Sequence, residues 1–306
     1  MENIEKKNVF LADASLLFVA ILWGSGFIVI KNALEIMHPI YILILRFSLA
    51  SIFLGLIFYK RLLKLKFEDL KAGFIIGLVL FIAFIAQTVG MQYTNVSNSA
   101  FITSSNVVMV PFVYWFISKK QPDIYGIIAA VMCFIGVGIL SVEGNMKINI
   151  GDGLTLICAV FFALHIVFIG IYSKKHDPIL LTILQFAFAA IFSLISGLIM
   201  GIEFTPIGGD MAVSVVYLVL AITILAFGIQ NIAQKYTTST HAAIILSLES
   251  VFGSLFAVWF LKEDLTIKLI LGSIIILLAI VTAETKWNFL TIAKQWSSNS
   301  QAIDKQ

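Results

Sequence analysis

Long apolar runs separated by short polar segments make up most of this 306-residue chain. A membrane-spanning helix needs roughly 20 apolar residues, whereas a strand of a membrane barrel has about 10 residues that alternate in polarity. The runs here are long and do not alternate, so they indicate helices. The pattern predicts ten membrane spans, near residues 13–30, 40–59, 70–91, 98–117, 124–141, 152–171, 179–200, 211–233, 242–261 and 267–284.

Composition agrees with this pattern. Hydrophobic residues make up 60% of the chain and charged residues only 12%, whereas a soluble domain has about 25% charged residues. We therefore expect an integral membrane protein surrounded by lipid. No small-x-small cleavage site follows the first apolar run, so this run is interpreted as a retained helix and not as a signal peptide. The net charge of +3 is small, and no nucleic-acid partner is expected.

The distribution of basic residues predicts the orientation. If the N-terminus is cytoplasmic, the inside segments carry 15 Lys and Arg residues and the outside loops carry 4. Cytoplasmic loops of membrane proteins are enriched in these residues. Adding or removing one span would destroy the bias, so it also supports the count of ten. We expect a multi-pass protein of the bacterial plasma membrane with both termini in the cytoplasm.

The chain contains an internal repeat. "YTNVSNSAFITSSN" (93–106) aligns with "YTTSTHAAIILSLE" (236–249) at an offset of 143, and Pro39 aligns with Pro178 at an offset of 139. Each half holds five predicted spans, and because five is odd the second half is inverted in the membrane. Inverted repeats are typical of secondary transporters, whose substrate site lies near the midplane between the halves. The alternative is a duplication without a transport role.

The repeat predicts four regions. These are a cytoplasmic N-terminus at 1–12, a first five-helix repeat at 13–145, a second at 146–285 and a cytoplasmic tail at 286–306.

Three stretches resemble a known family. "LWGSGFIVIKNAL", "GMQYTNVSNSAFITSSNVVMVPF" and "AQKYTTSTHAAIILSLESVFGSLFAVWFLKEDLT" are similar to EamA-type transporters of the drug/metabolite transporter superfamily. The resemblance extends from about residue 13 to 285, and Ser250 stands where such families usually carry a proline. It implies an all-α membrane fold of ten helices in two inverted five-helix repeats around a central cavity. It also implies transport of small metabolites, often amino acids and often outward.

Two ionisable residues lie inside predicted spans. Glu249 is near the middle of 242–261, and Arg46 lies about six residues from the outer end of 40–59. A charge at the centre of a lone helix costs about 2.5–3.5 kcal/mol, so both side chains should face a cavity or a partner. Glu249 could bind a substrate amine or carry a proton, and Arg46 could bind a substrate carboxylate. Alternatively, Glu249 joins two helices, or Arg46 pairs with Glu249 or with helix-end carbonyls.

Several further residues are candidates for the same cavity. Gln87 and Gln230 are repeat counterparts, and Asn106 is the counterpart of Glu249. The alternative for the two glutamines is an interhelical hydrogen bond worth about 0.6 kcal/mol. His165 is a candidate proton relay or a satisfied interhelical histidine. Aromatic candidates for the lining are Trp23, Phe27, Phe84, Phe161 and Phe162, although most aromatic residues in such a chain pack or face lipid.

Motifs for other functions are missing from the sequence. It contains no P-loop, no "GxSxG" and no metal-ligand spacing, and Cys133 and Cys158 lie inside apolar segments. We expect no cofactor, no metal and no enzymatic activity, because a membrane enzyme would need a nucleophile or paired acids near a membrane face. The sequence therefore predicts a secondary transporter of a small metabolite, monomeric or homodimeric, with a coupling proton as a candidate partner. A non-transporting scaffold or sensor is the alternative.

Overall fold

The computed structural model describes residues 2–119, 121–141, 149–203, 208–237 and 239–285, and within these ranges the chain is helical with no strand. The predicted tail at 286–306 lies outside the described residues. The first half contains α1 (Glu2–Ala33), α2 (Pro39–Ile57), α3 (Tyr59–Leu62), α4 (Phe67–Gly90), α5 (Val96–Ser104), α6 (Asn106–Ser118) and α7 (Ile124–Ser141). The second contains α8 (Ile150–Tyr172), α9 (Pro178–Met200), α10 (Gly209–Tyr217), the π-helix η1 (Leu218–Leu225), α11 (Ala226–Ala233), α12 (Ser239–Ser247), α13 (Glu249–Phe256), the π-helix η2 (Ala257–Leu261) and α14 (Ile267–Thr285).

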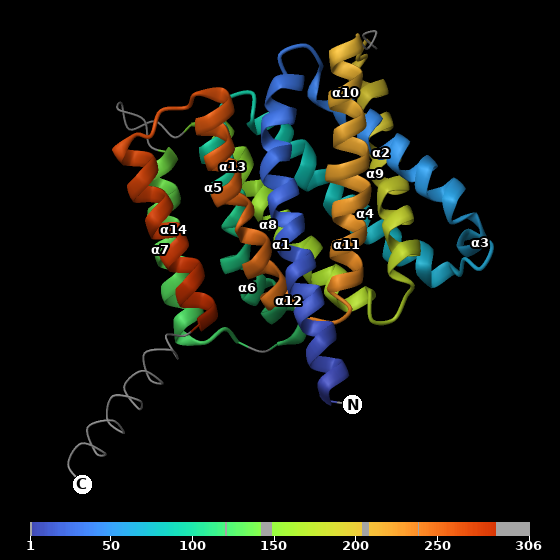
Figure 1. The fold of residues 1–306 in the computed structure, drawn as a ribbon, viewed down its shortest axis with the longest axis horizontal. Helices are drawn as coiled ribbons and strands as arrows, with labels where there is room; N and C mark the ends of the chain where they lie inside the picture. Colours follow the sequence, from blue (N-terminus) through green and yellow to red (C-terminus); the bar gives the residue numbers. More distant parts are fainter. Residues whose placement is uncertain (1, 120, 142–148, 204–207, 238, 286–306) are drawn as a thin grey trace.

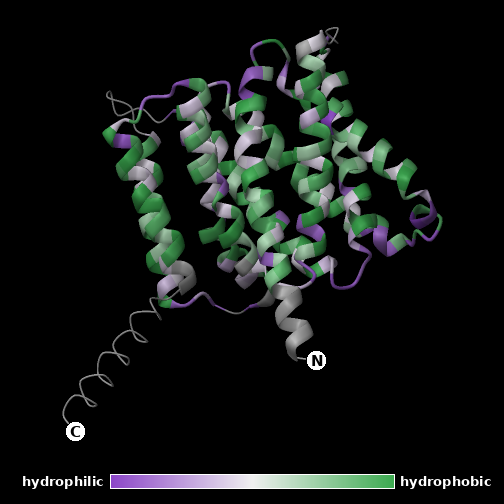
Figure 2. Ribbon diagram, in the orientation of Figure 1, coloured by the Kyte–Doolittle hydropathy of each residue, from purple (hydrophilic) through white to green (hydrophobic). Residues whose placement is uncertain are grey.

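These helices confirm the predicted ten-helix membrane fold. In the described part of the chain, nine helical segments are long and apolar enough to span a membrane, and a tenth apolar helix, Ile267–Thr282, is shorter. Figure 2 shows hydrophobic residues along the helices and hydrophilic residues gathered at their two ends. Helix α1 extends beyond its predicted span, from Glu2, but its apolar part begins at Phe10.

The two halves form inverted repeats. Helix α1 packs against α13, and its counterpart α8 packs against α6, the counterpart of α13. Helix α2 packs against its counterpart α9, and α7 packs against its counterpart α14 (Figure 1). Likewise, α4 packs along α8 in the way that α11 packs along α1. All of these contacts join one half of the chain to the other, so each half completes the core of the other.

The fourth and ninth spans are interrupted at equivalent points. Ser105 separates α5 from α6, and Leu248 separates α12 from α13, at the repeat offset of 143. At the second break the amide of Val251 donates to Leu248 O (3.1 Å) in a tightened turn. The hydroxyl of Ser250 donates to the Ser247 carbonyl at 2.8 Å. Serine hydroxyls compete with backbone amides for such carbonyls, so the helix is interrupted without a proline at 250.

The two breaks meet at the centre of the molecule. The Ser104 hydroxyl donates to the carbonyl of Ser247, its repeat counterpart, at 3.1 Å. Asn106 and Glu249 therefore begin their half-helices close to the point where the two halves join.

Small residues allow close packing of α4 on α9. A Cβ added at Gly77 would lie 2.8 Å from Gln185 O and 2.7 Å from Phe188 Cβ. The first of these atoms belongs to the backbone and cannot rotate away. Gly77 is the second glycine of "GFIIG", and this contact agrees with a packing role for that pattern.

Gly77→Ala should therefore destabilise the fold. Overpacking of this kind costs about 1–3 kcal/mol, so we expect a lower unfolding temperature of the detergent-solubilised protein. Gly138→Ala in α7 is the control, because an added Cβ there meets nothing within 4 Å. Equal unfolding temperatures for Gly77→Ala and wild type would contradict the close contact.

Candidate functional site

A buried cavity lies between the two halves, close to the helix breaks. Its lining comes from α1, α2, α4, α6, α8, η1, α11, α12 and α13. The volume open to the centre of a water molecule is about 40 Å³, and one water needs about 10–15 Å³ on this measure. The cavity in this conformation therefore has room for a few waters, and a larger molecule requires it to open. All seven residues selected from the sequence line it, namely Trp23, Arg46, Gln87, Asn106, His165, Gln230 and Glu249.

Glu249 presents a buried carboxylate at the second helix break. It is the first residue of α13 and is only 7% exposed. Within the described part of the chain, the structure shows no hydrogen bond or ion pair to this carboxylate. Asn106, its counterpart at the start of α6, is also 7% exposed, and its Oδ1 has no partner among the described residues. The break thus brings a carboxylate and an amide oxygen, both able to accept hydrogen bonds, to one cavity.

Arg46 is held at one edge of its guanidinium group. Its Nε donates to Thr223 Oγ1 at 2.5 Å, and Thr223 in turn donates to Leu218 O at 2.7 Å within η1. The guanidinium carbon lies 4.2 Å from the centroid of the Phe84 ring, a favourable cation–π geometry. Its Nη1 and Nη2 have no partner among the described residues. The guanidinium is therefore fixed in place while its two outer nitrogens can bind another group.

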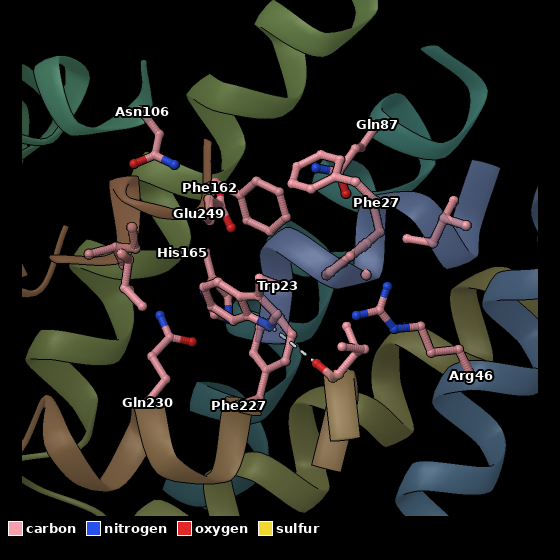
Figure 3. A pocket seen from close by; sticks show the side chains of 16 residues that line it. Trp23, Phe27, Arg46, Gln87, Asn106, Phe162, His165, Phe227, Gln230 and Glu249 are labelled. Atoms are coloured by element: carbon pink, nitrogen blue, oxygen red, sulfur yellow. Dashed lines mark hydrogen bonds between the residues drawn. The ribbon is translucent and has the colours of Figure 1, made fainter. Parts of the chain in front are cut away.

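The two charges are separate in this conformation. Figure 3 shows Arg46 and Glu249 on opposite sides of the cavity. Direct pairing of Arg46 with Glu249, one of the alternatives predicted from the sequence, does not occur in this conformation.

Several aromatic rings line the same cavity. Phe227 lies at their centre, with ring centroids 4.9 Å from Trp23, 5.8 Å from His165 and 5.9 Å from Phe84. Sequence analysis missed Phe227, although it is the counterpart of Phe84 at the offset of 143 and could have been found that way. Phe27 and Phe162 also line the cavity, whereas Phe161 is not part of the lining.

The two cavity glutamines differ in their partners. Gln87 Nε2 donates to Thr103 Oγ1 at 3.2 Å, which is the interhelical bond that was one of its two interpretations. Gln230, only 1% exposed, has no partner among the described residues for either its Oε1 or its Nε2. The two glutamines therefore occupy equivalent positions in the two repeats, but they do not form equivalent hydrogen bonds.

His165 forms an interhelical hydrogen bond. Its Nε2 lies 2.9 Å from Gln185 Oε1, and because an amide oxygen only accepts, this nitrogen carries the hydrogen. Gln185 is the counterpart of Arg46. The geometry is that of a satisfied histidine linking α8 and α9. Among the described residues there is no group of three His, Cys, Asp or Glu side chains that could hold a metal ion.

Polar contacts close the molecule at both ends. At the end away from the described termini, Lys31 Nζ donates to Met91 O (2.6 Å) and Thr94 O (2.8 Å). At the other end, His176 Nδ1 lies 2.6 Å from Asp69 Oδ1, and Arg61 pairs with Asp177. The Asp69–His176 and Arg61–Asp177 contacts join the two halves, whereas the Lys31 contacts lie within the first half. At the Lys31 end the two halves are joined by Glu263, whose carboxylate accepts hydrogen bonds from the amides of Val96 and Ser97.

The fold and cavity describe a multi-pass membrane protein built from two inverted repeats. The chain matches the EamA-like transporter family over residues 10–142 and again over residues 149–284, and it belongs to that family.

Similar proteins point to the same class. An uncharacterized transporter of Archaeoglobus fulgidus is 38% identical over 278 residues, covering 88% of this chain and 84% of the relative. The uncharacterized transporter YvbV of Bacillus subtilis is 24% identical, with 94% of each chain covered. One protein of known crystal structure superposes with a TM-score of 0.65 at 14% identity, covering 88% of this chain and 96% of the other, which supports the fold.

Thr223→Val tests the anchoring of Arg46. The substitution keeps the shape of the side chain but removes the only hydrogen-bond partner of Arg46 in the described structure, so we expect a loss of about 1–3 kcal/mol of stability. Thr88→Val is the matched control, because the buried Thr88 Oγ1 has no partner among the described residues. Thermal unfolding of both variants measures the difference. If Thr223→Val is no less stable than Thr88→Val, Thr223 does not anchor the guanidinium.

Proposed function

We propose that this transporter moves a small zwitterionic metabolite, such as an amino acid, across the membrane by alternating access, and that it exports it. One observation carries the proposal. A guanidinium whose two outer nitrogens have no partner among the described residues lies across the cavity from a buried carboxylate, and aromatic rings line the same cavity.

Each wall suits one part of such a substrate. The planar fork of Arg46 matches a carboxylate, which it can bind through two parallel hydrogen bonds. Glu249 and the amide oxygen of Asn106 suit an ammonium group, which only donates hydrogen bonds. The rings of Trp23 and Phe227 suit the apolar part of the molecule. A zwitterion that satisfies both charges also removes the cost of leaving them unpaired in a buried site.

Glu249 is also the proposed coupling group. A carboxylate can hold either a proton or the substrate ammonium, so Glu249 can exchange one for the other as the cavity opens to one side or the other. The opening follows from the fold. The contacts of Glu263 with Val96 and Ser97 at one end and of Asp69 with His176 at the other would break in turn, because the two inverted halves give two near-equivalent conformations.

The proposed orientation places both termini in the cytoplasm. It rests on the excess of Lys and Arg in the loops on the side of the termini. The proposed location is the plasma membrane of a prokaryote, since the relatives described above come from an archaeon and a bacterium. We propose a monomer or homodimer.

Transport in proteoliposomes tests the site. Arg46→Gln copies the counterpart Gln185, and Glu249→Gln removes the carboxylate with little change of shape. Each should reduce exchange of radiolabelled amino acids by about tenfold or more, because a hydrogen bond to a charged group contributes about 1.5–3 kcal/mol.

The control is Lys64→Gln, which removes an exposed charge outside the cavity and should leave exchange unchanged. Exchange at the wild-type rate in both cavity variants would refute the assignment. A third outcome would limit Glu249 to a coupling role: the Glu249→Gln variant exchanges amino acids normally but no longer accumulates them when a pH gradient is applied.

Cysteine labelling tests the orientation. The native Cys133 and Cys158 are buried, so the background is low. Gln92 and Lys64 are exposed at opposite ends of α4. With a membrane-impermeant maleimide on intact cells, Gln92→Cys should react and Lys64→Cys should react only after lysis. The reverse pattern would place the termini outside.

A further inference from the structure

The amide of Gln230 is the polar group in the cavity that the proposed charge pairing leaves unused. It lies in α11, is 1% exposed and lines the cavity, yet neither Oε1 nor Nε2 has a partner among the described residues. A buried amide that can both donate and accept, and does neither, is costly by the measure of ordinary protein hydrogen bonds. Such a group is expected where a ligand supplies the missing bonds.

Comparison of the two repeats shows why Gln230 lacks the hydrogen-bond partner that Gln87 has. In the first half, Gln87 donates to Thr103. At the offset of 143, the counterpart of Gln87 is Gln230 and the counterpart of Thr103 is Leu246, which also lines the cavity. Leucine offers no hydrogen bond, so the same interhelical bond cannot form in the second half. Gln230 is therefore left without the interhelical bond that Gln87 makes.

None of the other described cavity residues forms a hydrogen bond with the Gln230 amide. His165 is bonded to Gln185 through Nε2, and Arg46 lies on the opposite side of the cavity from Gln230 (Figure 3). The amide therefore remains available at a place apart from the proposed carboxylate site.

We propose that Gln230 determines specificity by binding a neutral polar group on the substrate side chain, a hydroxyl or a carboxamide. This inference rests on the proposed function, since Arg46 and Glu249 bind the two charged ends. A neutral polar group is favoured because Arg46 and Glu249 already bind the two charged ends, and the amide adds an acceptor and two hydrogens but no counter-charge for a third. A hydroxyl or carboxamide has both a donor and an acceptor and satisfies the amide, whereas an aliphatic side chain of the same size leaves it unpaired. Sites of this kind reject the analogue that lacks the polar group.

Pairs of amino acids of similar shape test the inference. Purified wild-type protein is titrated with threonine against valine, glutamine against methionine, and tyrosine against phenylalanine, and binding is followed by thermal stabilisation. In at least one pair the polar member should bind about tenfold more tightly or better. Gln230→Met, which keeps length but removes the amide, should reduce that preference to less than about threefold.

Two further variants separate binding from folding. Leu246→Thr gives Gln230 the partner that Thr103 gives Gln87, so it should weaken the preference while Gln230 remains present. Gln234→Met removes another buried amide one turn along, which donates to Ile166 O at 3.2 Å and does not line the cavity. This control should keep the preference even if it lowers the unfolding temperature.

The outcomes distinguish this inference from the proposed function. If amino acids bind but the apolar member of each pair binds as well as the polar one, or if the preference survives in Gln230→Met, the role of Gln230 is wrong and the zwitterion site stands. If no amino acid stabilises the wild-type protein, both the zwitterion site and the role of Gln230 are overturned.

Discussion

The cost of burying charge in a membrane governs this structure. Glu249 and Arg46 cannot face lipid. Glu249 begins α13 beside a helix break, and Arg46, inside the regular helix α2, bonds to Thr223 of the π-helix η1. Irregular backbone at membrane depth is tolerated where it is buried or lines a cavity. Both side chains line one enclosed cavity beside these irregular segments, so the cost of burying charge accounts for where the candidate site lies.

A symmetric framework carries asymmetric chemistry. The helix pairings and the breaks at Ser105 and Leu248 recur in both halves, which favours two conformations of similar energy. The side chains at equivalent cavity positions differ, as the substitution of Gln185 for Arg46 and of Asn106 for Glu249 shows. In the proposed mechanism the backbone exchanges between two states while the bound zwitterion meets a carboxylate on one side and a guanidinium on the other.

Much of this could be predicted from the sequence, and the limits have physical causes. Apolar runs and the repeat predicted ten helices in two inverted halves, because the thickness of a bilayer fixes the length of a span. The cost of burying charge selected Arg46 and Glu249, and all seven chosen residues line one cavity. The role of Thr223 was not predicted, because a lone threonine in an apolar run gives no signal in the sequence. Only the folded structure shows that the π-helix brings it to Arg46. The difference in hydrogen bonding between Gln87 and Gln230 was not predicted either, because it depends on which residue lies opposite each glutamine on the neighbouring helix. Whether these residues bind substrate stays a prediction.

The most direct test of the account removes one charge at a time from the ligand. For the amino acid that binds the purified wild-type protein most tightly, its affinity is compared with that of the acid lacking the amine and that of the amine lacking the carboxylate. Both analogues are smaller than the parent, so neither can clash with the cavity wall. If Arg46 and Glu249 bind the two ends, each analogue binds at least about tenfold more weakly, a difference of about 1.4 kcal/mol or more. An analogue that binds as tightly as the parent would contradict the account.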